Sequence, residues 1–256
     1  MRPLTIAAAG AILCIPASAQ RPSAEEQQHA LGAARDYAIH YTSKLPDFLC
    51  TEQMERVSST SASNTHVDRL SIQLSFNGRK EQYKLVAMNG SPTKQSFASL
   101  DGLISGGEFG SQLIGIFDPV SAADFQWKEG STLRKRRVAV YTYRIQRAKS
   151  HYMVGGRNDD GKLASGPAGY HGDVFLDGET SRVLRLTAAA DDIPKEFDIL
   201  TSTVEVDYDF VPVAGKSYLL PSHSKSAMEH GFRKISNTVT FTNYRKFEAD
   251  STIDFK

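Results

Sequence analysis

Alternation between apolar and polar positions runs through most of the chain and predicts β-strands. From residue 69 to 76 every second residue is apolar, and Asn77-Gly78 then provides a turn signal before a return strand at 81–87. The same two-residue period recurs at 203–210, and further strands are expected at 48–57, 133–146, 217–228 and 235–247. One apolar and one polar face on these strands is typical of an antiparallel sheet that is covered on one side.

A hairpin between Gly169 and Thr187 is the clearest local signal. Two β-prone runs flank the polar segment 177–181, in which Asp177-Gly178 favours a reversal of the strand. Because predicted strands lie on both sides of it in the sequence, the hairpin is expected in the middle of one large sheet.

A helix is predicted before the first strand. Ser23 and Glu26 match a capping box, in which the serine caps the helix and the glutamate returns to the serine backbone. The helical pattern continues to about Lys44, and Pro46 ends it. The stripe expected to pack on the sheet is Leu31, Ala34, Ala38, Tyr41 and Leu45.

The segment 91–125 interrupts the strand pattern with the glycines Gly102, Gly106, Gly107 and Gly110. Only a short helix fits, near 111–116. Its apolar side chains have to be buried, so the segment is expected to form a plug or lid across the sheet. The candidate lid and wall of a ligand site are Phe109, Leu113, Ile116, Phe117, Trp127, Tyr141, Tyr143 and Phe175.

Together these elements predict an α+β fold in a single domain, residues 20–256. An N-terminal helix packs on a large, strongly curved antiparallel sheet of about eight to ten strands in meander order, with a short helix or lid inserted. Roughly 235 residues are enough for a β-rich domain to be stable through its hydrophobic core alone.

The first nineteen residues have the three parts of a secretory signal peptide. Arg2 forms a positive n-region, residues 4–15 a short apolar h-region, and Pro16-Ala17-Ser18-Ala19 a cleavage site that ends in small residues. Cleavage is expected after Ala19. This predicts an exported protein, periplasmic or extracellular, with no transmembrane segment in the mature chain.

Charge and cysteine content narrow the functional classes. Without Arg2, the basic residues balance the 29 acidic ones, so nothing favours nucleic acid or an anionic membrane surface as a partner. Cys14 leaves with the signal peptide and Cys50 remains alone, which excludes an internal disulfide. The one basic cluster is interpreted as a solvated strand entrance, with a lipid headgroup or acidic partner as the alternative. Its members are Lys128, Arg134, Lys135, Arg136 and Arg137.

The predicted architecture resembles that of the LolA-type lipoprotein carriers and of the periplasmic stress-sensor regulators that share their half-barrel. This likeness rests on Phe117-Asp118-Pro119 with Ala123, Phe125 and Trp127, and on Val174–Asp177 with Arg182–Leu186. It implies a curved antiparallel sheet that wraps around helices and holds acyl chains. A closer likeness is to an uncharacterised family of exported bacterial proteins with no known activity, and is carried by Gly106–Gly110, Tyr170–Gly172 and Asn243–Phe247.

Cys50 is a candidate nucleophile, because a lone thiol in an exported protein can react or pair with another chain. It follows Phe48 and Leu49 in a predicted strand, where a buried and inert cysteine is the simpler interpretation. No cysteine-hydrolase signature accompanies it.

His171 and Asp173 stand one residue apart on a predicted strand, point the same way and could form an acid–base or metal pair. Two ligands do not make a metal site, and neither HExxH nor a paired Cys/His array is present. Glu108, among glycines and apolar residues, could be a general acid with a raised pKa or could cap the short helix that follows. The sequence therefore assigns no catalytic residue, metal or cofactor.

The leading hypothesis is a non-enzymatic exported protein whose curved sheet binds an apolar ligand, such as a lipid, or an envelope protein. Residues 109–117 would cover its concavity. Two alternatives remain open. One is a hydrolase that uses Cys50, or Glu108 with His171. The other is a structural or assembly subunit of an envelope complex, which would expose an apolar patch instead of a cavity.

Overall fold

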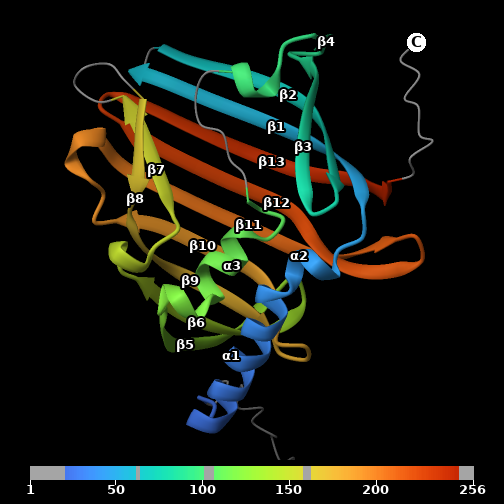
Figure 1. Ribbon diagram of the computed structural model, residues 1–256, viewed down its shortest axis with the longest axis vertical. Coiled ribbons are helices and arrows are strands. Elements are labelled where there is room, and N and C mark those ends of the chain that lie inside the picture. The colour runs from blue at the N-terminus through green and yellow to red at the C-terminus, as the bar shows by residue number, and fades with distance from the viewer. Residues whose placement is uncertain (1–20, 62–63, 101–106, 158–162, 248–256) are drawn as a thin grey trace, which may run out of the picture.

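The computed structural model of the chain describes residues 21–61, 64–100, 107–157 and 163–247 (Figure 1). The predicted signal peptide lies outside these residues. The helices are α1 (Ala24–Ile39), α2 (Tyr41–Lys44) and α3 (Ser111–Phe117), with single 3-10 turns at Phe97–Ser99, Pro119–Ser121, Arg147–Lys149 and Lys195–Phe197. The strands are β1 (Phe48–Ser61), β2 (Asn64–Asn77), β3 (Lys80–Met88), β4 (Ser91–Pro92), β5 (Asp124–Leu133), β6 (Arg136–Ile145), β7 (Met153–Arg157), β8 (Leu163–Pro167), β9 (Gly169–Asp177), β10 (Val183–Asp191), β11 (Ile199–Val213), β12 (Lys216–His230) and β13 (Arg233–Lys246).

Within the described residues, eleven strands form one antiparallel sheet that does not close into a barrel (Figure 1). Their order is β4-β3-β2-β1-β13-β12-β11-β10-β9-β6-β5, and β7 pairs with β8 in a separate two-stranded sheet. The predicted meander order is wrong at one point, because β1 pairs with the last strand, β13, with Met54 opposite Val239. This long-range pairing places β1 inside the sheet.

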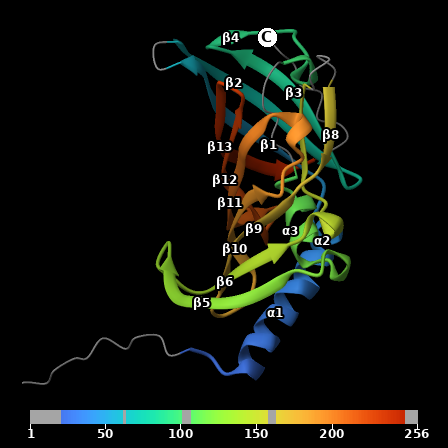
Figure 2. The ribbon, with the colours of Figure 1, turned by 90° about the vertical axis from the view of Figure 1, so that its left-hand side faces the viewer.

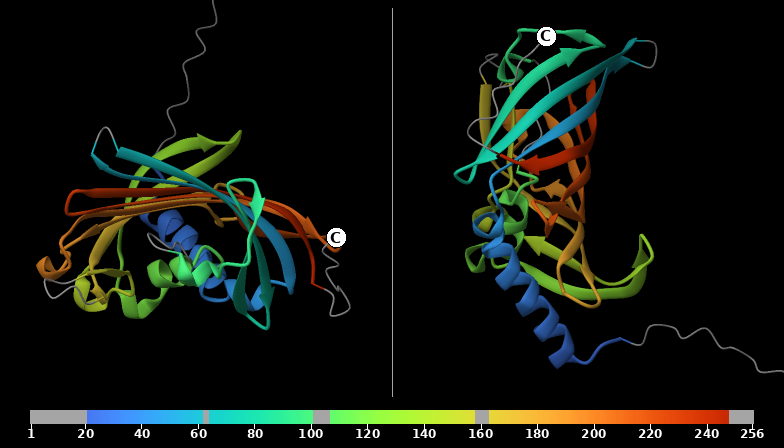
Figure 3. Two further views of the ribbon diagram at one scale, coloured as in Figure 1. Left: turned by 90° about the horizontal axis from the view of Figure 1, so that it is seen from above. Right: turned by 90° about the vertical axis from the view of Figure 1, so that its right-hand side faces the viewer.

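The sheet is arched, and the three helices lie on its concave side (Figures 2 and 3). One core cluster joins α1 and α3 to β6, β9, β10 and β11, and a second is built on β1, β2 and β13. The predicted α+β architecture is confirmed: an N-terminal helix and a short inserted helix pack on a large, curved antiparallel sheet.

The predicted apolar stripe attaches the N-terminal helices to the sheet. Ala34, Ala38 and Tyr41 are buried, and the Tyr41 hydroxyl donates to the Leu219 carbonyl on β12 at 2.8 Å. The helix is divided at His40, which is the C-cap of α1 and the N-cap of α2. None of the described helices is long and apolar enough to cross a membrane.

The capping box at the start of α1 is confirmed. Ser23 Oγ accepts a hydrogen bond from the Glu26 amide at 3.2 Å, and the Ser23 amide donates to Glu26 Oε2 at 2.8 Å. Ser23→Ala is therefore expected to lower the free energy of unfolding by about 1 kcal/mol, measured by chemical denaturation with far-UV circular dichroism. The control is Ser96→Ala, since the exposed Ser96 side chain caps no helix. Equal losses in the two variants would contradict the role of the cap.

The strand predicted at 133–146 is β6, which begins only at Arg136, and a turn and another strand, β5, precede it. The chain reverses at Arg134 and Lys135, whose φ angles are 46° and 67°, so that β5 and β6 form a hairpin. Sequence patterns missed this turn because it contains no glycine or asparagine, the residues that normally mark a left-handed turn. Trp127 consequently lies in β5.

The hairpin predicted at 169–187 is confirmed as β9 and β10. The Asp177 carboxylate shapes its turn by accepting hydrogen bonds from the amides of Glu179, at 2.8 Å, and Thr180, at 3.3 Å. β9 pairs with β6 on its other side, and β10 pairs with β11. The hairpin therefore lies inside the sheet, as predicted.

Candidate functional site

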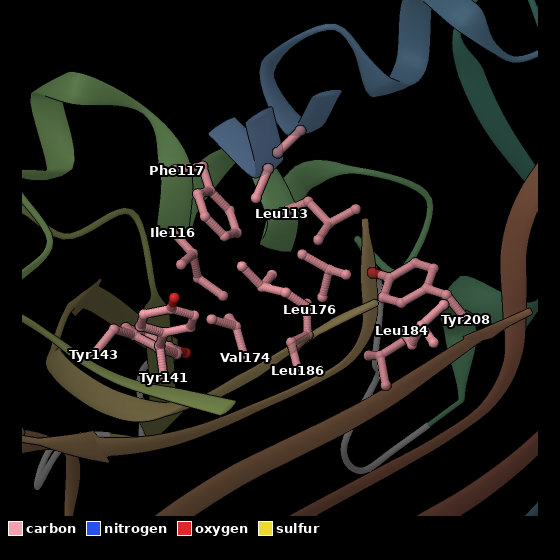
Figure 4. Packing of buried hydrophobic residues seen from close by; sticks show 14 of the residues in the cluster. Leu113, Ile116, Phe117, Tyr141, Tyr143, Val174, Leu176, Leu184, Leu186 and Tyr208 are labelled. Atoms are coloured by element: carbon pink, nitrogen blue, oxygen red, sulfur yellow. The ribbon is translucent and has the colours of Figure 1, made fainter. Parts of the chain in front are cut away.

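The short helix α3 packs directly on the concave face of the sheet. Its N-cap, Gly110, has a φ of 138°, and a Cβ at this position would approach Thr42 Cγ2 to 2.5 Å. Only glycine therefore lets the segment pass so close to α2. Side chains of α3 and of the sheet point toward one another in Figure 4; they are Leu113, Ile116, Phe117, Tyr141, Tyr143, Val174, Leu176, Leu184, Leu186 and Tyr208.

Most of the predicted lid and wall residues meet around α3. The buried ones are Leu113, Ile116, Phe117, Tyr141 and Tyr143. Trp127 joins them from β5, with its ring edge-on to Tyr141 and the centroids 5.4 Å apart. Phe109 is buried in the neighbouring cluster, where its ring centroid lies 5.4 Å from that of Phe48. The insertion therefore forms part of the packed core.

Phe175 does not join this group. Successive side chains of a strand point to opposite faces, and Val174 and Leu176 face α3 (Figure 4), so Phe175 faces the convex side. There the Arg185 guanidinium carbon lies 5.9 Å from its ring centroid. Phe175 is therefore not part of a wall on the concave side.

A cavity of about 290 Å³ lies between α3, β7 and the sheet. Gly115 leaves it open, because a Cβ at this position would meet only the Tyr170 hydroxyl, at 3.4 Å. The exposed side chain of Met153 lies at its edge. The apolar part of the lining is Ile116, Tyr170, Leu186, Ala188 and Val204. Of the predicted lid and wall residues, Ile116 alone contributes to this lining.

Hydroxyl groups line the cavity beside these apolar side chains. The Tyr152 hydroxyl and Ser202 Oγ are hydrogen-bonded at 3.1 Å. Ser226 Oγ is buried and has no hydrogen-bond partner among the described residues. Ser111, Gln112, His151 and Thr203 also line the cavity. Sequence reasoning missed this polar set, since a serine in a strand such as β12 is informative only when the register shows which way it points.

Glu108 does not cap α3, contrary to one of the two interpretations of the sequence. The N-cap is Gly110, and no side-chain cap hydrogen bond is present there among the described residues. The buried Glu108 carboxylate accepts a hydrogen bond from the Ser224 hydroxyl at 3.3 Å, and the Glu108 carbonyl accepts one from the Tyr208 hydroxyl at 2.9 Å. These bonds hold the insertion on the sheet.

A second buried carboxyl group, that of Glu52 on β1, lies in the same region. Burial, together with the negative charges of Glu108 and Glu81, raises the pKa of Glu52 to about 9. Glu52 is therefore protonated at neutral pH, which is compatible with its position in the interior of the protein.

His171 lies on the convex face, so the sheet separates it from Glu108. Its Nδ1 is 2.9 Å from Asp191 Oδ2, which also accepts a hydrogen bond from Arg144 Nη1 at 2.7 Å. His171 lines a wide hollow of about 1000 Å³ on this face, together with Asp173. The geometry does not support joint action of Glu108 and His171 as an acid–base pair.

Members of the predicted basic cluster form ion pairs within the protein. Lys128 pairs with Asp173 at 2.8 Å, Arg134 with Asp207 at 2.7 Å and Arg136 with Asp177 at 2.6 Å. These three cations are paired with carboxylates at this end of the sheet, so they are not simply solvated, contrary to the interpretation of the cluster as a solvated strand entrance.

Cys50 is buried and forms no disulfide among the described residues. Burial above all, with the negative charge of Glu52, raises the pKa of its thiol. A nucleophilic thiol needs the opposite shift, so the environment of Cys50 favours the inert interpretation. Within the described part of the chain, no group of three or more His, Cys, Asp and Glu side chains is placed to hold a metal ion.

No protein-family profile matches the chain, and no curated protein matches it. Similar solved structures include LolA superfamily protein NE2245 from Nitrosomonas europaea, 10% identical over 90% of this chain and 97% of that one, with a TM-score of 0.38. A putative outer membrane lipoprotein-sorting protein domain from Vibrio parahaemolyticus is 12% identical over 88% of this chain and 94% of that one, with a TM-score of 0.45. A DUF1329 family protein from Desulfovibrio piger is 11% identical over 87% of this chain and 95% of that one, with a TM-score of 0.41. LolA-type proteins are thus among the solved structures to which the chain is similar.

Proposed function

We propose that the chain is a non-enzymatic, exported binding protein that holds an apolar ligand between α3 and the concave face of the sheet. The observation that carries the proposal is the cavity of about 290 Å³ with its largely apolar wall. Its size is near the lower end of the roughly 300–1,000 Å³ typical of small-molecule sites.

The packing of α3 defines the form of the proposed site. Leu113 and Phe117 are buried in the main core, so α3 acts as a fixed wall and not as a hinged lid. The outer edge is formed by β7, where Met153 is 59% exposed. A flexible, polarisable methionine at this edge suits contact with an apolar chain.

The two alternative functions have weaker support. A hydrolase would need Glu108 and His171 on one face of the sheet, or an accessible thiol at Cys50. An assembly subunit would need a continuous apolar surface, whereas the proposed binding protein rests on the cavity. Four large apolar residues of the described chain are more than half exposed. They are Val120, Met153, Leu200 and Phe232.

Native mass spectrometry of the purified mature protein tests the proposal. We expect the wild type to carry a copurifying lipid or to bind an added amphiphile. Gly115→Leu should remove the bound mass, because its side chain extends from α3 into the cavity. The fold should be retained, since leucine favours a helix by roughly 1 kcal/mol over glycine.

The matched control is Ala189→Leu. Ala189 follows the cavity residue Ala188 on β10 but faces the convex side, so this variant should keep the ligand. Equal loss of ligand in both variants, or a wild type that binds no lipid or amphiphile at all, would overturn the proposed function.

A further inference from the structure

The polar side of the cavity contains a hydroxyl group that has no hydrogen-bond partner within the described part of the chain. Ser226 is only 5% exposed, and its Oγ forms no hydrogen bond with the described residues. A buried polar group without a partner costs roughly 1–3 kcal/mol, so such a group in a cavity points to a ligand that satisfies it.

The register of the sheet directs this hydroxyl to the concave side. Ser226 lies opposite Val204 on β11, which in turn lies opposite Ala188 on β10. These three positions share one face of the sheet, and all of them line the cavity. The Ser226 side chain is therefore directed to the face of the sheet on which a ligand would lie against Val204 and Ala188.

The part of the cavity lining that the structure describes offers no countercharge to a charged ligand. Among the described residues that line it there is no Asp, Glu, Lys or Arg, and His151 at its exposed rim is the one ionisable imidazole. A charged head group placed beside Ser226 would lose its hydration without gaining an ion pair. An uncharged oxygen-containing head group would gain a hydrogen bond and leave no charge buried.

The volume of the cavity limits the length of the apolar part of the ligand. At roughly 30 Å³ per group, the volume share of one water molecule, the cavity of about 290 Å³ takes about ten non-hydrogen groups. This matches a medium-length acyl chain, or the head-proximal part of a longer chain that leaves past β7.

We infer that the cavity is specific for uncharged acyl amphiphiles, with Ser226 Oγ hydrogen-bonded to an ester or hydroxyl oxygen of the head group. This inference rests on the proposed function and adds the class of ligand. The Tyr152–Ser202 hydroxyl pair lies on the same lining and provides further donor and acceptor positions.

Titration calorimetry with two probes of equal chain length tests the inference. Monodecanoylglycerol is uncharged, and decanoate is ionised at pH 8. Below their micellar concentrations, the wild-type protein should bind the glyceride at least tenfold more tightly than decanoate. Similar affinities for the two probes would overturn the head-group preference and leave the proposed function intact.

Ser226→Ala separates a ligand-binding role from a structural one. We expect the variant to bind the glyceride about fivefold more weakly, the equivalent of one hydrogen bond. Without ligand it should be as stable as the wild type or more so, because an unpaired buried hydroxyl has been removed. The control, Ser236→Ala, changes a serine on the convex face and should alter neither quantity.

Two further outcomes count against the inference. Unchanged glyceride affinity in Ser226→Ala would remove the assigned role of this hydroxyl. If neither probe binds the wild type and Gly115→Leu also has no effect, the proposed function fails together with the inference.

Discussion

Gly172→Ala is expected to lower the free energy of unfolding by about 3 kcal/mol, the upper part of the range for overpacked sites. A Cβ on Gly172 would lie 1.9 Å from the Thr187 carbonyl oxygen and 2.6 Å from its carbonyl carbon. Both are backbone atoms, so no side-chain rotation relieves the clash. The strands β9 and β10 would have to separate at the centre of the sheet.

This separation would disrupt two further interactions at the same place. The Tyr143 hydroxyl donates to the Thr187 carbonyl at 2.8 Å, and Thr187 Oγ1 accepts from the Asp173 amide at 2.9 Å. For a domain of this size the loss corresponds to a fall in Tm of about 10 °C, measurable by thermal and chemical denaturation.

Gly32→Ala is the matched control. A Cβ on Gly32, which lies in α1, would meet no atom within 4 Å, so alanine should raise helix stability by up to about 1 kcal/mol. If the free energy of unfolding of Gly172→Ala stays within about 0.5 kcal/mol of the wild-type value, the close approach of β9 and β10 is not a constraint on the fold.

Stability is expected to fall as the pH rises from about 5 to 8, and Glu52 should cause much of this fall. The folded state raises the pKa of Glu52 from 4.5 to about 9, so between these values the folded protein holds a proton that the unfolded chain has released. The unfolded state binds fewer protons, and the free energy of unfolding decreases with pH by up to about 1.4 kcal/mol per unit.

Glu52→Gln removes this titration while keeping the shape of the side chain. The variant should show a flatter pH dependence and should exceed the wild type in stability by roughly 1–3 kcal/mol at pH 8. Urea denaturation at intervals between pH 5 and pH 8 measures both quantities. Glu81, whose pKa is also raised by burial, is present in both proteins, so its contribution to the pH dependence of stability cancels in the comparison.

Glu55→Gln is the control on the same strand. The Glu55 side chain is 49% exposed and pairs with Arg69 at 3.2 Å, so Glu55→Gln changes a surface carboxylate and should not reproduce the flatter pH dependence expected of Glu52→Gln. Parallel pH curves for wild type and Glu52→Gln would show that burial does not hold a proton on Glu52.

The local elements could be predicted from the sequence where the responsible residues are neighbours. The Ser23–Glu26 capping box, the Asn77-Gly78 turn between β2 and β3, and the β9–β10 hairpin follow from side chains within a few residues of one another. The β5–β6 turn could not, because Arg134 and Lys135 adopt positive φ without a glycine. There Arg134 is held by distant groups, Asp207 and the carbonyls of Leu184 and Tyr208.

The candidate site was predictable only in its apolar part. The spacing of Leu113, Ile116 and Phe117 indicated a buried insertion, and the structure places these side chains against the sheet. Ser226, Tyr152 and Ser202 carry no sequence signal, since they come from separate strands and a loop that meet only when the sheet has formed. The sequence left a helix cap open as one interpretation of Glu108, because its actual partner, Ser224, is more than a hundred residues away.

The sequence by itself determined the class of the fold: the two-residue period, the N-terminal helix and the inserted apolar helix specify one curved antiparallel sheet covered on one face. Only the tertiary structure decided which residues share a site. The pairing of β1 with β13 and the register of β11 on β12 depend on contacts between distant segments, and a shift of one residue would turn Ser226 to the convex face. Local patterns act over a few residues, whereas a cavity is defined by the relative position of whole strands.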